Sequence, residues 1–107
     1  MHFEVYQKAA IKTSKMSKAD RWYFALGLCG EAGEVAEKVK KHYRDDKGTI
    51  TLERREAIKN ELGDTLWYLS MVASAFGINL EDVATSNLEK LAVRDEQGLI
   101  HGDGDNR

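Results

Sequence analysis

Residues 26–41 read LGLCGEAGEVAEKVKK and residues 61–69 read ELGDTLWYL, and these two stretches decide how the chain folds. Each stretch holds two acidic residues with the same internal spacing, Glu31 with Glu34 and Glu61 with Asp64. Residues three positions apart lie on one face of an α-helix, one above the other. Two such helices that pack side by side would therefore bring four carboxylates together.

The composition of the whole chain favours helices. The 107 residues include no proline, and Ala, Leu, Glu and Lys are frequent, which predicts an all-α fold. Capping residues and glycines divide the chain into four helices within one domain, residues 1–107, that ends in an irregular glycine-rich tail at 98–107. The expected helices are Phe3 to Ile11, a second from the N-cap Ser17 to about Tyr43, a third from the N-cap Thr51 to Phe76 before Gly77, and a fourth from the N-cap Asn79 to Gln97 before Gly98.

Apolar residues at spacings of three and four predict which helix faces form the core. In the third helix these residues are Ile58, Leu62, Leu66, Leu69, Val72 and Phe76, and in the fourth they are Leu80, Ala84, Leu88 and Leu91. Cys29 stands in an apolar helical stretch with no histidine near it in sequence, so we expect it to fill the core and not to act as a nucleophile.

Charge and cysteine content exclude several classes of protein. The formal net charge of −2 gives no indication of nucleic-acid binding, and no apolar run approaches the ~20 residues needed to span a bilayer. One cysteine excludes an intrachain disulfide. Together with the lack of a signal-peptide pattern, this predicts a cytoplasmic protein without membrane or nucleic-acid partners.

Four unpaired carboxylates in one place repel one another, so we expect a cation among Glu31, Glu34, Glu61 and Asp64. Hard oxygen ligands without histidine or thiolate suit Mg²⁺, with Mn²⁺ as the alternative. Neither acidic pair has the histidine that a di-iron helical bundle uses, which argues against redox iron. Gly27, Gly30 and Gly33 interrupt the second helix and Gly63 the third. They indicate either close helix approach or space for a bulky ligand beside the acids.

The fourth helix places an amide and two cations, Asn87, Lys90 and Arg94, on one face. Such a face could bind phosphate, or it could be an ordinary solvated face paired with neighbouring acids. Tyr68 follows Asp64 by one helical turn, and Trp22 begins the second helix. A nucleobase could stack on either ring, although core or subunit contacts would account for Trp22 equally well.

The chain resembles the MazG-like branch of the all-α nucleoside triphosphate pyrophosphohydrolases, whose signature is Glu-x-x-Glu, a spacer, and Glu-x-x-Asp. The resemblance extends beyond the acids to Tyr6-Gln7, to NLEKL at 87–91 with Arg94 after it, and to the closing HGDGDNR. It implies a four-helix bundle that forms homodimers or homotetramers with the site near a subunit interface. It also implies Mg²⁺-dependent hydrolysis of a nucleoside triphosphate between the α and β phosphates, which gives the monophosphate and pyrophosphate.

The resemblance further implies roles for single residues. Glu31, Glu34, Glu61 and Asp64 match the metal-binding acids, and Asn87 and Lys90, joined by Arg94, match positions that face the substrate phosphates. The residue that accepts a proton from the attacking water stays open between Glu34 and Glu37. Three alternatives also stay open: a pyrophosphatase for phosphoribosyl-ATP or a guanosine polyphosphate, a non-catalytic nucleotide- or metal-binding regulator, and a purely structural helical oligomer.

Overall fold

The fold is all-α in the computed structural model, which describes residues 1–17 and 20–98. Four helices follow one another in this part of the chain: α1 (Phe3–Thr13), α2 (Arg21–Asp45), α3 (Leu52–Ala75) and α4 (Leu80–Gln97). The predicted class and number of helices are therefore confirmed for these residues. The tail expected at 98–107 lies outside the described residues except for Gly98.

Local capping signals placed four of the helix ends correctly. The hydroxyl of Thr51 accepts the N–H of Arg54 at the start of α3, and the side chain of Asn79 accepts the N–H of Glu81 at the start of α4. At Gly77 and Gly98 the backbone takes a left-handed conformation, with φ of 69° at both, which ends α3 and α4 where glycine predicted it.

The predicted start of α2 at Ser17 is wrong. The helix begins at Arg21, with Asp20 at the N-cap position, and the carbonyl of Ser17 accepts the N–H of Asp20. Serine favours turns as well as N-caps, because its hydroxyl can hydrogen-bond nearby backbone in either setting. The sequence pattern therefore could not choose between the two.

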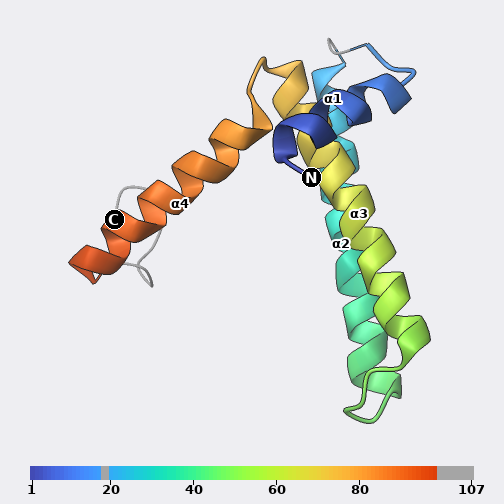
Figure 1. The fold of residues 1–107 in the computed structure, drawn as a ribbon. Helices are drawn as coiled ribbons and strands as arrows, with labels where there is room; N and C mark the ends of the chain where they lie inside the picture. Colours follow the sequence, from blue (N-terminus) through green and yellow to red (C-terminus); the bar gives the residue numbers. More distant parts are fainter. Residues whose placement is uncertain (18–19, 99–107) are drawn as a thin grey trace.

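An antiparallel hairpin of α2 and α3 is the main body of the structure, and α1 crosses it near the C-terminal end of α3 (Figure 1). The buried core lies at this crossing and centres on Phe24, Met71, Ala10 and Ala75. The ring of Phe24 meets that of Trp67 edge-to-face at 6.2 Å. The indole N–H of Trp67 donates a hydrogen bond to the hydroxyl of Thr13 at 2.8 Å, which connects α3 to the end of α1.

At the other end of the hairpin, contacts between charged side chains take the place of a buried core. Arg54 of α3 donates from Nε to Asp46 Oδ2 at 2.9 Å, and His42 Nδ1 lies 3.0 Å from the same oxygen. The pKa of Asp46 is lowered, mainly because Arg54 and then His42 hydrogen-bond its carboxylate. These contacts fix the loop that joins α2 to α3 and so set the register of the two helices.

The fourth helix leaves the hairpin and extends away from it (Figure 1). It contacts α1 and the end of α3 but not α2. Its first turn is anchored by the buried side chain of Gln7, which accepts the N–H of Leu80 at 2.8 Å and donates to the carbonyl of Ile78 at 2.9 Å. No helix within residues 1–17 and 20–98 is long and apolar enough to cross a membrane.

Several residues predicted to lie in the core are exposed in the single chain. On α3, Leu62 is 52% exposed and Phe76 55%, and on α4 Leu88 is 67% exposed. Cys29 is also exposed, so its predicted core position is wrong. The spacing identified apolar faces correctly, but α3 turns toward its neighbours the side that carries Trp67, Met71 and Ala75.

Gly27 of α2 lies directly against the ring of Tyr68 on α3. A Cβ atom built on it would lie 2.1 Å from Cε1 of the Tyr68 ring, well inside van der Waals contact. Gly30 and Gly33, further along the same helix, have no such neighbour within 4 Å among the residues that the structure describes. Of the two explanations for the glycines, close helix approach therefore holds for Gly27 but not for Gly30 or Gly33 within one chain.

We expect Gly27→Ala to destabilise the protein, because the methyl group and the Tyr68 ring would occupy the same space. Overpacking of this kind costs about 1–3 kcal/mol, more than the ~1 kcal/mol that alanine adds through helix propensity. Gly30→Ala is the matched control and should stabilise the protein by up to about 1 kcal/mol, since its methyl group would meet no atom. Urea unfolding followed by circular dichroism measures both. Equal effects of the two substitutions would contradict the role of Gly27.

Candidate metal and phosphate site

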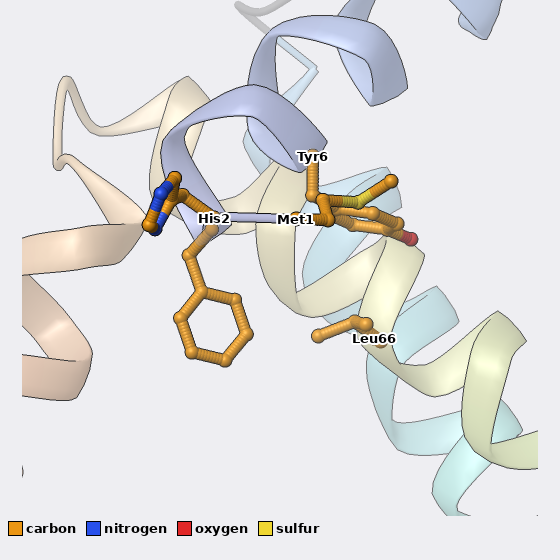
Figure 2. Close-up of a pocket in the computed structure, with 5 residues that line it drawn as sticks. Met1, His2, Tyr6 and Leu66 are labelled. Carbon is orange, nitrogen blue, oxygen red and sulfur yellow. The ribbon is translucent and has the colours of Figure 1, made fainter.

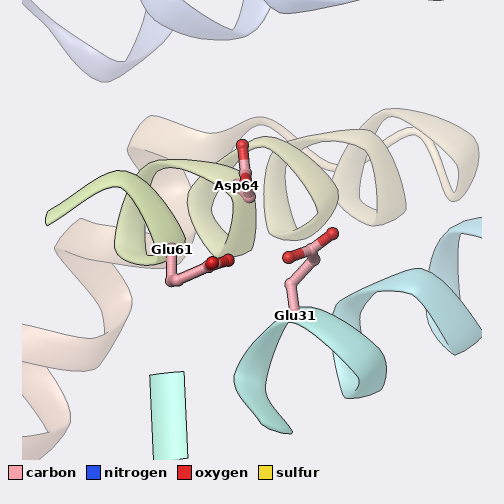
Figure 3. A group of neighbouring side chains, drawn as sticks. All are labelled: Glu31, Glu61 and Asp64. Atoms are coloured by element: carbon pink, nitrogen blue, oxygen red, sulfur yellow. The ribbon is translucent and has the colours of Figure 1, made fainter. Parts of the chain in front are cut away.

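Three of the four predicted acids converge across the hairpin. Glu31 of α2 faces Glu61 and Asp64 of α3 (Figure 3), and one carboxylate oxygen from each lies within 4.8 Å of the others. Glu31 and Glu61 are half-buried, while Asp64 is exposed. These three residues are called the acid cluster below. The antiparallel pairing of α2 and α3 positions it about midway along the hairpin.

The fourth acid, Glu34, is not in the acid cluster, although its charge acts on Glu31. Its side chain is exposed on α2, one turn beyond that of Glu31. Partial burial is the main reason why the pKa of Glu31 is raised, and repulsion from Asp64 and Glu61 comes next. The charge of Glu34 and a side-chain hydrogen bond with Glu61 raise this pKa further.

The donor set of the acid cluster fits a hard divalent cation. It offers three carboxylates and neither imidazole nor thiolate, which is the ligand preference of Mg²⁺ and Mn²⁺. After its partial burial, repulsion from Asp64 and Glu61 contributes to the raised pKa of Glu31. A cation placed among the oxygens would remove the repulsion that raises it.

Tyr68 completes the α3 side of the site. Its ring lies against Gly27, and its pKa is raised first by a hydrogen bond with Tyr23, then by burial, with smaller effects from Glu31 and Asp64. Its hydroxyl therefore lies within the electrostatic field of the acid cluster. Trp22, the other aromatic proposed from sequence, is 84% exposed.

An apolar pocket lies on the α1 side of the acid cluster. Figure 2 shows its lining, which consists of Met1, His2, Phe3, Tyr6 and Leu66. Burial raises the pKa of Tyr6, and the charge of Asp64 adds to this effect, so the pocket and the acid cluster are neighbours. Its volume of about 140 Å³ is below the ~300–1,000 Å³ typical of a whole-ligand site.

The structure does not gather the predicted phosphate ligands beside the acids. Asn87 lines a groove with Leu66 and Leu69 of α3. Lys90 and Arg94 belong to the C-terminal half of α4. This helix extends away from the hairpin (Figure 1). Lys90 is partly buried and Arg94 is only 5% exposed.

Sequence reasoning missed Lys38, which the structure brings to the acid cluster. Its Nζ lies 3.7 Å from Oε1 of Glu61, and both side chains are largely buried, at 26% and 18% exposed. A signal was available, because Lys38 follows Glu34 by four residues and Glu31 by seven and so shares their helix face.

Comparison with known proteins identifies a family and two relatives. Residues 23–99 match the MazG nucleotide pyrophosphohydrolase domain. The "Gene 37 protein" of Mycobacterium phage L5 is 43% identical over 114 residues, which cover 100% of both chains. The "Uncharacterized protein YvdC" of Bacillus subtilis (strain 168) is 32% identical over 74 residues, which cover 64% of this chain and 70% of that protein.

No solved structure matched the chain significantly. The family match spans both acidic pairs and reaches to the end of α4, so it includes the acid cluster together with Lys38, Asn87 and Arg94. The chain belongs to the MazG nucleotide pyrophosphohydrolase domain family.

Proposed function

We propose that this protein is a Mg²⁺-dependent nucleoside triphosphate pyrophosphohydrolase. It would cleave ribo- or deoxyribonucleoside triphosphates between the α and β phosphates and release the monophosphate and pyrophosphate. The observation that supports this most directly is the convergence of Glu31, Glu61 and Asp64 in a chain of this family. A cytoplasmic location follows as part of the same proposal, because nucleotides are the substrates.

The acid cluster would hold the metal, joined by Glu34 after a side-chain rotation. When bound, Mg²⁺ supplies positive charge for the phosphates and lowers the pKa of water. The chain's own residues would then orient the triphosphate so that water adds to phosphorus as the α–β bridging bond breaks. The bridging oxygen leaves on one product and the water oxygen stays on the other.

Glu34 is the better candidate for accepting the proton of the attacking water. The alternative, Glu37, is paired with Lys40 at 3.0 Å and with Lys41 at 3.5 Å. A hydrogen bond from Lys40 is the main reason why the pKa of Glu37 is lowered, which makes it a weaker base. Glu34 points from the same face as Glu31 and adds to its electrostatic field.

The remaining predicted ligands suggest that a site uses two chains. In a single chain α4, which carries Lys90 and Arg94, does not contact α2, which carries Glu31. Large apolar side chains on α2, α3 and α4, including Leu26, Leu62 and Leu88, are more than half exposed. A homodimer, or a homotetramer built from dimers, would cover these residues and bring α4 of one copy to the acids of another.

The nucleobase has two candidate positions. It could enter the apolar pocket of Figure 2, which neighbours Asp64 through Tyr6. It could instead stack on Tyr68, with Trp22 of either copy closing the site.

We expect wild-type protein to release pyrophosphate with Mg²⁺ and Glu61→Gln to lose at least about a hundredfold in kcat/KM, since metal neutralisation of phosphate contributes several kcal/mol. A pyrophosphate assay over the common ribo- and deoxynucleotides, phosphoribosyl-ATP and a guanosine polyphosphate measures this and identifies the substrate class. Glu56→Gln is the matched control, because Glu56 is an exposed acid on the same helix. Nucleotide binding without pyrophosphate release would instead indicate a regulator.

We expect Glu31→Gln to raise the melting temperature of the metal-free protein, because the variant no longer keeps an ionised carboxylate partly buried and close to the charges of Asp64 and Glu61. A raised folded-state pKa means that ionised Glu31 destabilises the fold above that pKa, and that this penalty disappears as pH falls below the ordinary carboxyl value. The advantage of the variant should therefore vanish between neutral and acidic pH. Wild type, but not the variant, should gain stability from Mg²⁺, about 2.7 kcal/mol at a hundredfold excess over Kd. Scanning calorimetry with and without Mg²⁺ measures both effects.

We expect two inactive variants, Glu61→Gln and Lys90→Met, to restore activity when they are mixed under conditions that exchange subunits. One site of each mixed dimer would then combine intact acids from one copy with an intact α4 from the other. Random mixing should give about a quarter of wild-type activity. A mixture as inactive as its components, with exchange shown by mass spectrometry, would mean that each site uses the α4 of its own chain.

A further inference from the structure

Among the ion pairs of the described residues, the one that involves the acid cluster joins Lys38 to Glu61. The Nζ atom of Lys38 lies 3.7 Å from Oε1 of Glu61, and its side chain reaches that carboxylate across the hairpin from α2 to α3. Neighbouring lysines on α2 are engaged elsewhere, since Lys40 and Lys41 both pair with Glu37. Lys40 is also far more exposed, at 62% against 26% for Lys38.

The position of Lys38 relative to the acids is set by the helix. It follows Glu34 by one turn and Glu31 by two, so the three side chains form one line along α2. The line ends where Glu61 of α3 approaches. A lysine side chain is a flexible stem that carries a compact charge, so its ammonium group can reach either α3 or a ligand above the acid cluster.

The charges at the site indicate what Lys38 does when ligands arrive. Without a metal, its ammonium group partly offsets the negative charge of the three clustered acids. A divalent cation bound to those acids competes with Lys38 for Glu61. The metal still leaves the acids and a bound triphosphate with excess negative charge, so the displaced ammonium group has a nearby anion to bind.

We infer that Lys38 exchanges partners during the reaction cycle: it is the counterion of Glu61 in the metal-free protein and a phosphate ligand in the substrate complex. This inference rests on the proposed function, because it takes the acid cluster to be the metal site. Lys38 would contact the phosphate from α2 of the same chain that carries the acid cluster. The assignment is independent of where α4 lies.

The partner exchange predicts two effects of opposite sign for Lys38→Met. The variant should bind metal alone roughly two- to fivefold more tightly than wild type. In the variant the ammonium group of Lys38, which pairs with Glu61 at a partly exposed position, no longer competes with the metal. The KM for the nucleotide should rise about ten- to hundredfold, because a charged hydrogen bond to phosphate is lost. A variant that merely perturbs the fold would weaken both kinds of binding.

The experiment titrates Mn²⁺ without nucleotide, follows the free ion by electron paramagnetic resonance, and measures pyrophosphate release separately. Lys38→Arg keeps the charge and should keep KM within a few-fold of wild type. Lys40→Met is the matched control, because Glu37 retains Lys41 as its partner. It should change neither Mn²⁺ affinity nor KM.

The outcomes separate this inference from the proposed function. Tighter Mn²⁺ binding together with a higher KM in Lys38→Met supports the exchange. If wild-type protein is active and Lys38→Met leaves Mn²⁺ affinity and KM unchanged, the role of Lys38 is overturned and the proposed function stands. Weaker binding of both Mn²⁺ and nucleotide by the variant has the same meaning. Wild-type protein that neither binds Mn²⁺ nor releases pyrophosphate overturns both.

Discussion

Repulsion among the carboxylates of Glu31, Glu61 and Asp64 is the constraint on which the rest of the structure depends. Acids this close oppose the pairing of α2 with α3, so the two helices must be held together from elsewhere. At one end the aromatic core around Phe24 supplies the attraction, and at the other the contacts of Asp46 fix the connecting loop. The acid cluster lies between two stabilised regions and does not contribute stability of its own.

Sequence predicted the parts of this fold that short-range chemistry determines. The caps at Thr51 and Asn79 and the glycine stops at 77 and 98 need only a few neighbouring residues, and the structure has all of them. The convergence of Glu31 with the second acidic pair was also predictable, because equal spacing on two helices of a hairpin aligns their faces. Glu34 was grouped with them on the same grounds, but its side chain lies outside the acid cluster.

The sequence-based predictions of burial and of ion pairs failed where the packing of one helix against another determines them. Periodicity shows that Leu62 and Leu88 lie on apolar faces, but it does not show whether another helix covers those faces. Cys29 was assigned to the core for the same reason and is exposed. Lys38 was overlooked because a lysine four residues after a glutamate on a helix is ordinarily a surface ion pair, and its true partner, Glu61, comes from the other helix.

Glycines on α2 connect these observations to function. Each glycine inside a helix costs about 1 kcal/mol relative to alanine, and contact with Tyr68 accounts for this cost at Gly27 alone. Gly30 and Gly33 flank Glu31 and have nothing within 4 Å of a Cβ atom. Among the described residues no contact gives a stabilising reason for either one, and the proposed function offers a reason for the bare backbone beside Glu31. A triphosphate above the acid cluster, or a helix of a second copy, would use the space that two missing side chains leave open.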